Sequence, residues 1–206
     1  MGYRVAVVGA TGNVGREMLN ILSERKFPAD DVVALASERS VGREVSFGDA
    51  TLKVRDLAKF DFKGIDIALS SPGAKVSAVH SPRAAAAGAV VIDNTSHFRM
   101  ERDVPLVVPE VNVAALRSLP RGIVSIPNCT TTPLVMALKP LHDAVGVKRV
   151  VVTTFQSVSG TGAAAMDELL DQTRALMAFR DVKAQVYPYQ IAFNLLPHIG
   201  SFAESG

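Results

Sequence analysis

From residue 3 to residue 146, short apolar runs alternate with longer stretches whose apolar residues recur at helical spacing. The runs have the length of buried strands, and turn-forming residues follow each of them. Strands that alternate with helices in this way predict an α/β fold with a doubly wound, Rossmann-type, mostly parallel sheet. The expected strands are 3–8, 31–36, 65–70, 89–92 and 122–126, the expected helices are 13–25, 74–87 and 134–141, and small strands or a hairpin are expected over 44–47 and 51–56.

The pattern changes after Val147. Residues 148–158 predict a longer, β-rich strand, and 163–179 predict a helix with a Met/Leu stripe on one face. Such a stripe is typical of a core or a subunit interface, not of a catalytic site; its members are Met166, Leu169, Leu170, Thr173, Leu176 and Met177. One strand and one helix cannot bury an independent core. Either a partner covers this part or the chain is a portion of a longer protein, and we favour the second.

Composition excludes several classes of protein. The chain has 206 residues, a net charge of +2 and 48% hydrophobic residues, which suits one large or two modest domains. No cluster of basic and aromatic residues predicts binding to nucleic acid, and no apolar run or signal peptide predicts a membrane partner. A single cysteine excludes an intrachain disulfide and suits the cytoplasm. The four histidines and the cysteine have no metal-ligand spacing, so no metal is expected.

Three glycines after the first strand indicate a nucleotide-binding turn. Gly9, Gly12 and Gly15 have the spacing G-x-x-G-x-x-G between an apolar strand and an amphipathic helix. Such glycines allow a tight turn and a close approach of the backbone to a pyrophosphate at the helix N-terminus. The alternative is a βα turn with a structural role only, and the flanking elements favour nucleotide binding.

The end of the second strand bears on which nucleotide binds. A carboxylate there usually holds a ribose 2′-hydroxyl, whereas arginine and hydroxyl groups meet a 2′-phosphate. Ser37, Arg39 and Ser40 supply that phosphate chemistry, so the sequence predicts NADP(H). Glu38 would favour NAD if its side chain pointed into the site, and Arg39 has the alternative of a solvated loop residue.

The single cysteine, Cys129, lies between the strand 122–126 and the helix 134–141. A thiol near a helix N-terminus sees unpaired backbone N–H groups and the positive end of the helix dipole, which stabilise a thiolate nucleophile. The threonines at 130–132 can add hydroxyl donors. A small buried cysteine without a chemical role is the alternative.

These candidate residues are expected at one edge of the sheet. Ligands of doubly wound sheets bind beyond the carboxyl ends of the strands. The segments that directly follow strands are 9–15, 37–40, 70–73, 93–99 and 128–129. We therefore expect the glycine turn, the phosphate-binding residues and the thiol to share one rim.

Six segments in this order resemble one family, the aspartate-semialdehyde dehydrogenases of the bacterial type. They are 9–15 (GATGNVG), 37–40 (SERS), 94–100 (NTSHFRM), 107–112 (VVPEVN), 127–131 (PNCTT) and 155–162 (FQSVSGTG). The resemblance covers the whole chain, and because family members are longer, it implies an N-terminal portion. It also implies an NADP-binding Rossmann-type domain over 1–128 and the beginning of an α+β catalytic and dimerisation domain over 129–206.

The resemblance implies a reaction: the reversible, NADPH-dependent reduction of L-aspartyl 4-phosphate to L-aspartate 4-semialdehyde, on the route to lysine, threonine and methionine. Cys129 would form an acyl thioester, and Asn128 would help to position its carbonyl group. Gln156 would orient the substrate, although a strand-end glutamine that caps a loop is the alternative. Arg99 would hold the phosphate with a bidentate guanidinium, and a surface ion pair is the alternative.

The resemblance also assigns cofactor contacts and an assembly. Residues Thr11, Gly12, Asn13 and Val14 would contact the cofactor phosphates together with Arg39 and Ser40, and Ser159 and Gly160 would approach its nicotinamide half. The implied assembly is a homodimer or a dimer-based tetramer. The family's general acid/base histidine and substrate-carboxylate arginine match no position here. We assign no role to His80, His97, His142 or His198.

Three other readings stay open. N-acetyl-glutamyl-phosphate reductase shares the thioester chemistry, but the surroundings of Cys129 and the segment 157–162 favour the aspartyl enzyme. A glyceraldehyde-phosphate dehydrogenase is disfavoured for the same reasons. A non-catalytic, NADP-binding scaffold is the alternative of another class, and the presence of Cys129 argues against it.

Overall fold

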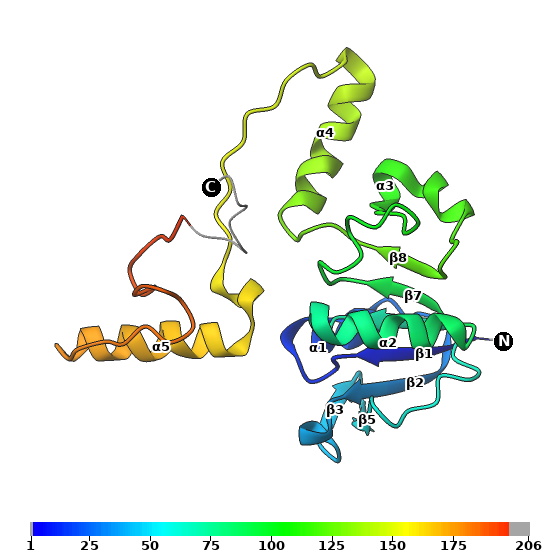
Figure 1. Cartoon of the computed structure of the whole chain (residues 1–206), viewed down its shortest axis with the longest axis horizontal. Helices are drawn as coiled ribbons and strands as arrows, with labels where there is room; N and C mark the ends of the chain where they lie inside the picture. The colour runs from blue at the N-terminus through cyan, green and yellow to red at the C-terminus, as the bar shows by residue number, and fades with distance from the viewer. Residues whose placement is uncertain (1, 198–206) are drawn as a thin grey trace. The chain divides into compact units, whose positions relative to one another are not determined.

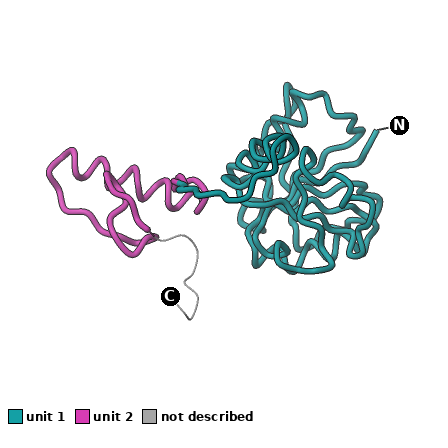
Figure 2. The backbone as a smooth tube through the Cα atoms, turned by 90° about the horizontal axis from the view of Figure 1, so that it is seen from above, with its two compact units in different colours: residues 1–154 teal, residues 155–206 magenta. Residues whose placement is uncertain are grey.

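The computed structural model describes residues 2–197, and the chain divides into two compact units, residues 1–154 and 155–206 (Figure 2). In chain order the elements are β1 (Tyr3–Val8), α1 (Asn13–Glu24), β2 (Ala29–Ala36), the 3₁₀ helix η1 (Glu38–Ser40), β3 (Glu44–Phe47), β4 (Ala50–Lys53), β5 (Arg55–Asp56), β6 (Ile67–Ser70), α2 (Ala74–Ala86), β7 (Val90–Asp93), α3 (Pro109–Asn112), η2 (Val113–Arg117), β8 (Ile123–Ser125), α4 (Thr131–Val145), η3 (Val158–Thr161) and α5 (Ala163–Met177).

The first unit contains a six-stranded sheet in the order β5-β2-β1-β6-β7-β8 (Figure 1). Every pair of neighbouring strands in it is parallel, and β3 and β4 form a separate antiparallel hairpin. The chain winds outward from β1 to β2 and β5, and then continues on the other side of β1 with β6, β7 and β8. The predicted doubly wound parallel sheet is therefore confirmed, with its topological switch point between β1 and β6.

The sheet separates two apolar clusters. Ala6 and Val8 of β1 belong to one cluster and Val7 to the other, because successive side chains of a strand point to opposite faces. Helix α2 and the segment 57–65 cover the first face, and α1 with the β3–β4 hairpin covers the second. Burial on both faces explains why these strands appear in the sequence as continuous apolar runs.

Most elements expected in the first unit are present, with shifted bounds. The segment 51–56 is divided between the hairpin and β5, which pairs with β2 in the main sheet. Helix α4 begins at Thr131, three residues before the predicted start, and continues through Pro140 to Val145. Among residues 2–197, no helix has the length and apolar character that crossing a bilayer requires.

The strand predicted over 148–158 is wrong. The described chain has no strand there, and only Val158 belongs to an element, the 3₁₀ helix η3. Val151 and Phe155 are 81% and 70% exposed. A β-rich sequence forms a strand only where a neighbouring strand pairs with its backbone, and none of the described residues supplies that pairing.

The second unit consists of η3, α5 and an irregular segment that follows α5. The helix predicted over 163–179 is confirmed, but its Met/Leu stripe is not a core within the described residues. Met166, Leu170 and Met177 are exposed, whereas Glu168 and Gln172 are buried. Whether the stripe is a subunit interface stays a prediction, as does the domain boundary between residues 128 and 129.

Candidate active site

The glycine turn between β1 and α1 has the close packing that its sequence predicts. Gly9 has a φ of 85°, a conformation that favours glycine. A Cβ atom on Gly15 would lie 2.2 Å from the Gly9 carbonyl oxygen, so only glycine fits where α1 meets the strand. A Cβ atom on Gly12 would meet nothing closer than 3.3 Å. That contact, with the Gly9 carbonyl oxygen, is tighter than most Cβ contacts, so the packing at Gly12 is close but less restrictive than at Gly15.

The N-terminus of α1 is suited to an anion. Its capping residue, Gly12, has no side chain that could accept a hydrogen bond from the first turn, and the N–H groups at a helix N-terminus attract phosphate. Thr11 is half-buried beside this terminus, and Gly12, Asn13 and Val14 are exposed. A helix N-terminus that follows a glycine turn in this way is suited to a dinucleotide pyrophosphate.

The residues that follow β2 form the short 3₁₀ helix η1. Ser37 and Arg39 are exposed, and the Arg39 side chain makes no ion pair or hydrogen bond with the described residues. The Glu38 carboxylate lies 3.7 Å from the Lys59 ammonium, and both groups are exposed. Arg39 is therefore available to an anion, while Glu38 interacts with a cation outside η1.

Arg99 is half-buried and held by two backbone carbonyl groups. Its Nε donates to the Ile126 oxygen at 3.0 Å, and its Nη2 donates to the Asn94 oxygen at 3.1 Å. These carbonyls belong to the residues that directly follow β7 and β8. Its guanidinium forms no ion pair with the described residues, so the alternative of a surface ion pair is not supported. Its positive charge is therefore held at the carboxyl edge of the sheet without an acidic partner among the described residues.

Cys129 is exposed, so the alternative of a small buried cysteine is wrong. It lies in a turn between β8 and α4, and its Sγ is 3.5 Å from Asn128 Oδ1, which accepts the thiol hydrogen. The same Oδ1 accepts from the Thr130 N–H at 3.0 Å and from the Thr130 hydroxyl at 2.9 Å. Asn128 thus holds the turn on which the thiol is presented.

The donors expected around the thiol have other partners. The N–H groups of Thr131 and Thr132 donate to the Asn128 carbonyl oxygen at 2.9 and 3.1 Å, and the Thr132 hydroxyl is 3.5 Å from the same oxygen. Asn128 is thus the acceptor for the three N–H groups and for the Thr130 and Thr132 hydroxyls, and the expected contribution of residues 130–132 to a thiolate stays a prediction. The position of the sulfur just before the first turn of α4 remains.

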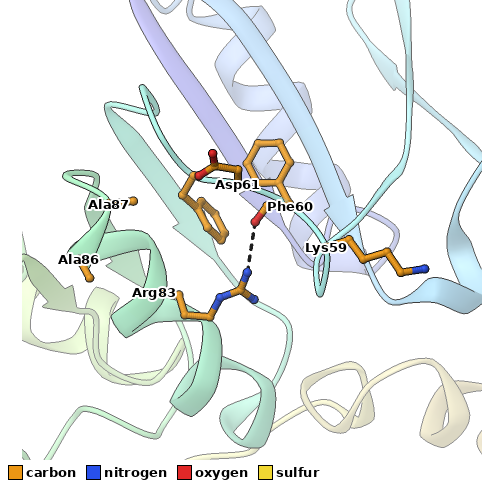
Figure 3. A pocket seen from close by; sticks show the side chains of 7 residues that line it. Lys59, Phe60, Asp61, Arg83, Ala86 and Ala87 are labelled. Carbon is orange, nitrogen blue, oxygen red and sulfur yellow. Dashed lines mark hydrogen bonds between the residues drawn. The ribbon is translucent and has the colours of Figure 1, made fainter.

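The glycine turn, η1, Asn94, Arg99 and Cys129 all follow carboxyl ends of strands in the first unit. The sequence prediction of a common edge agrees with this topology. A separate hollow opens between the segment 59–62 and α2, where Arg83 donates to the Phe60 carbonyl oxygen at 3.2 Å (Figure 3). None of the predicted site residues lines it.

Gln156, Ser159 and Gly160 belong to the second unit, around η3. The Gln156 amide packs on Gly160, where a Cβ atom would lie 2.7 Å from Nε2. The Ser159 hydroxyl and N–H both approach the Ser157 hydroxyl, at 3.1 and 3.3 Å. These three residues share one turn, and their predicted association with Cys129 stays a prediction. His198 lies outside the described residues.

One buried group at the same edge was not assigned a role from the sequence. Asp93, the last residue of β7, is fully buried and accepts hydrogen bonds from Ser77 and Ser81 of α2. The sequence does contain a pattern that could have predicted this cluster: two serines four residues apart on a helix, and an aspartate at the end of a strand.

Comparison with known proteins identifies the relatives of this chain. A family model described as semialdehyde dehydrogenase, NAD binding domain, matches residues 4–119, and one described as semialdehyde dehydrogenase, dimerisation domain, matches residues 138–206. Aspartate-semialdehyde dehydrogenase from Rickettsia typhi is 52% identical over 205 residues. This alignment covers 99% of the present chain and 61% of the relative, so the chain spans less than two thirds of that protein.

Two solved structures are similar in fold. Aspartate semialdehyde dehydrogenase II from Vibrio cholerae, solved in complex with ASA, matches with a TM-score of 0.94 and 48% identity, over 100% of this chain and 62% of that one. Aspartate semialdehyde dehydrogenase with NADP from Candida albicans matches with a TM-score of 0.59 and 29% identity, over 71% of this chain and 48% of that one. The resemblance to this family and the two-domain order inferred from it are confirmed.

Proposed function

The chain belongs to the semialdehyde dehydrogenase family, and on this premise we propose that the whole protein converts L-aspartyl 4-phosphate reversibly to L-aspartate 4-semialdehyde and phosphate, with NADPH as the reductant. The 52% identity to a named aspartate-semialdehyde dehydrogenase over almost the entire chain carries this proposal. The exposed thiol of Cys129, at the carboxyl edge of a dinucleotide-binding sheet, supports it independently. This reaction lies on the route to lysine, threonine and methionine.

Cys129 is the proposed nucleophile. Its sulfur forms a bond to the acyl carbon of aspartyl phosphate, the bond from that carbon to the phosphate oxygen breaks, and phosphate leaves with the electron pair. Asn128, which fixes the turn of the thiol through Thr130, keeps the sulfur exposed to the incoming carbonyl group. NADPH, when bound, would supply the hydride needed to reduce the thioester to the aldehyde, and Cys129 would leave as the thiolate.

Arg99 is the proposed phosphate-binding residue. Its Nε and Nη2 are fixed on two carbonyl groups, while its charge has no acidic partner among the described residues. A guanidinium that is already oriented loses little entropy when it binds an anion. Gln156 is proposed to orient the acyl group, and Ser159 and Gly160 to approach the nicotinamide half of the cofactor.

NADP(H) is the proposed cofactor. Thr11, Asn13 and Val14 surround the helix terminus that fits the pyrophosphate, together with Gly9 and Gly12. Ser37, Arg39 and Ser40 supply the groups that meet a 2′-phosphate, and the carboxylate of Glu38 interacts with Lys59. The description of the Candida albicans relative with NADP agrees with this choice.

A homodimer or a dimer-based tetramer is the proposed assembly. Residues 138–206 match a dimerisation domain, and the exposed apolar residues of α5, Met166, Leu170 and Met177, are candidates for the contact. A second copy that covers them would bury the apolar stripe that the described chain leaves open to solvent.

Reduction of NADP⁺ by the full-length protein tests the reaction, with L-aspartate 4-semialdehyde and phosphate as substrates. We expect turnover that requires phosphate and is abolished in Cys129→Ala, while that variant still binds NADPH. N-acetyl-glutamate semialdehyde is the matched control substrate, and preference for it would support N-acetyl-glutamyl-phosphate reductase instead. Cofactor binding without turnover of either aldehyde would support the non-catalytic scaffold.

A further inference from the structure

The last residues of three neighbouring strands are polar and buried. Ser70, Asp93 and Ser125 pair in register across β6, β7 and β8, and their exposed fractions are 2%, 0% and 0%. In-register residues of parallel strands point to the same face of the sheet. Helix α2 brings Ser77 and Ser81, also buried, against that face. An apolar core therefore gives way to a polar cluster at the edge where the candidate active site lies.

Asp93 is the centre of this cluster. Its Oδ2 accepts hydrogen bonds from the hydroxyl groups of Ser77 and, at 2.9 Å, of Ser81. Its Oδ1 accepts from the N–H of Thr95 at 2.7 Å. Asp93 forms no ion pair with the described residues, so neutral donors alone offset the cost of burying its carboxyl group. These three hydrogen bonds fix the orientation of the carboxyl group.

The backbone around Asp93 leads directly to Arg99. The Asp93 carbonyl oxygen accepts from the Ile126 N–H at 2.9 Å, and the Asn94 N–H donates to the Ser70 oxygen at 2.8 Å. Arg99 in turn donates to the carbonyl oxygens of Ile126 and Asn94. Asp93 thus contacts both sides of this arrangement: its carbonyl oxygen binds the N–H of Ile126, and its carboxyl group binds the Thr95 N–H of the same peptide unit whose Asn94 carbonyl holds the guanidinium.

We propose that Asp93, held by Ser77 and Ser81, is a positioning residue that fixes the Asn94–Arg99 loop and thereby the direction in which Arg99 presents its guanidinium. This inference rests on the proposed function, in which Arg99 binds the phosphate of the substrate. Asp93 is buried and acts through Arg99. Its loss should weaken the binding of phosphate selectively, and leave the binding of the cofactor and the reactivity of Cys129 largely unchanged.

The chain offers a matched pair of variants. Ser77 and Ser125 are both fully buried serines of this cluster region, but the Ser77 hydroxyl donates to Asp93, whereas the Ser125 hydroxyl has no partner among the described residues. Each change to alanine removes one buried hydroxyl group. Only Ser77→Ala removes a hydrogen bond to the carboxyl group, so a difference between the two variants reports on Asp93.

Steady-state kinetics of the full-length protein in the phosphate-consuming direction provides the first test. We expect Ser77→Ala and Asp93→Asn to raise KM for phosphate about tenfold, as the loss or weakening of one buried hydrogen bond predicts, with kcat and KM for NADP⁺ changed less than about threefold. Ser125→Ala should match the wild type. Asp93→Ala should have the largest effect, and Asp93→Asn should recover part of the loss, because its amide oxygen still accepts from the Thr95 N–H.

A second readout does not depend on activity. In the wild type the Arg99 Nε–H donates to Ile126, so nuclear magnetic resonance should find it protected from hydrogen exchange, with Arg99→Lys to assign the signal. Exchange should become about tenfold faster in Ser77→Ala and stay unchanged in Ser125→Ala.

The two readouts separate the inference from the proposed function. An inactive wild type would refute the proposed function, and the exchange of the Arg99 Nε–H would still test the role of Asp93. An active wild type in which Ser77→Ala and Asp93→Asn leave KM for phosphate unchanged would overturn the inference alone. Equal effects of Ser77→Ala and Ser125→Ala would also overturn it, because they would indicate general repacking.

Discussion

Different interactions stabilise each of the two units of the chain. In the first unit, two clusters of buried apolar residues cover both faces of a parallel sheet. In the second unit, the buried apolar residues among those described are Ala165 and Ala192, and the other buried side chains are Glu168 and Gln172. The first unit is therefore stabilised by apolar burial, and the second depends on hydrogen bonds from two polar side chains.

These two side chains of α5 bind the backbone of the segment that follows it. Oxygens of Glu168 accept from the N–H groups of residues 185–187. The Gln172 oxygen accepts from the N–H groups of Ile191 and Ala192 at 2.9 and 3.1 Å, and its nitrogen donates to the Lys183 oxygen at 3.0 Å. A segment held in this way depends on the ionisation of a carboxyl group, whereas an apolar core does not.

The largest effect is expected for Leu35→Ala in the first unit. Leu35 is fully buried in the apolar cluster under α2, so its truncation should lower the free energy of unfolding by about 2–5 kcal/mol. Leu116, which is 38% exposed, provides the control variant Leu116→Ala. Hydrogen exchange of the full-length protein should report faster opening in residues 1–154. Equal loss of protection in residues 163–192 would show that the two units open together.

A smaller, local effect is expected for Glu168→Ala. The three N–H groups of residues 185–187 lose their acceptor, but residues 185 and 186 are exposed and water can replace it, so the expected loss is about 0.5–1.5 kcal/mol, the net contribution of a typical hydrogen bond. Their exchange should accelerate while the amides of β1 and β6 keep their protection. Asp171→Asn, which changes an exposed carboxylate on the same helix, should have no effect. Unchanged exchange at 185–187 in Glu168→Ala would contradict the account of the second unit.

The same contact should depend on pH. Burial raises the pKa of the Glu168 carboxyl group, but the N–H donors of Val186, Gln185 and Tyr187 outweigh it and hold the pKa below its ordinary value. The folded state therefore prefers the carboxylate, and this stabilisation is present above the ordinary pKa and is lost as pH falls through the folded value. Protection of the residue 185–187 amides from hydrogen exchange, corrected for intrinsic exchange, should therefore decrease as the pH falls through the folded pKa. Glu168→Gln should abolish this dependence on pH.

Arg39→Ala should weaken the binding of NADPH, and of the variants discussed it should change the stability of the fold least. Arg39 is exposed and has no partner among the described residues, so thermal unfolding should match the wild type within about 0.5 kcal/mol. Affinity for NADPH should fall about tenfold or more, as expected for the loss of a charged hydrogen bond, while affinity for NADH stays nearly constant. Equal losses for both nucleotides would refute the assignment of Arg39 to the 2′-phosphate.

The contrast between the units also explains what the sequence could predict. Strands β1, β2 and β6 are continuous apolar runs because both faces of the sheet are covered, and the glycine turn follows from the close packing at Gly15. Residues 148–158 have the composition of a strand, but pairing depends on a neighbour that composition does not specify. The Met/Leu stripe of α5 predicted that apolar side chains would be buried. The side chains buried instead are Glu168 and Gln172, which accept hydrogen bonds from the segment 185–192.

The candidate site was predictable to a similar degree. The rim at the carboxyl ends of the strands follows from the alternation of strands and helices, and Cys129 and Arg99 were identified from their motifs. The hydrogen bonds from Arg99 to the carbonyl groups of Ile126 and Asn94 were not predictable, because they depend on the register of β7 and β8. The role of Asn128 as acceptor for Thr130 to Thr132 likewise depends on the conformation of one turn.

The central claim, that Cys129 carries the acyl group, is tested most directly by trapping the intermediate. The full-length protein is incubated with NADP⁺ and L-aspartate 4-semialdehyde without phosphate, quenched in acid and mapped by peptide mass spectrometry. We expect an aspartyl adduct on the peptide that contains Cys129, and we expect it to disappear when phosphate is added before the quench. Turnover without any adduct on Cys129, or an adduct on another residue that phosphate discharges, would contradict this claim.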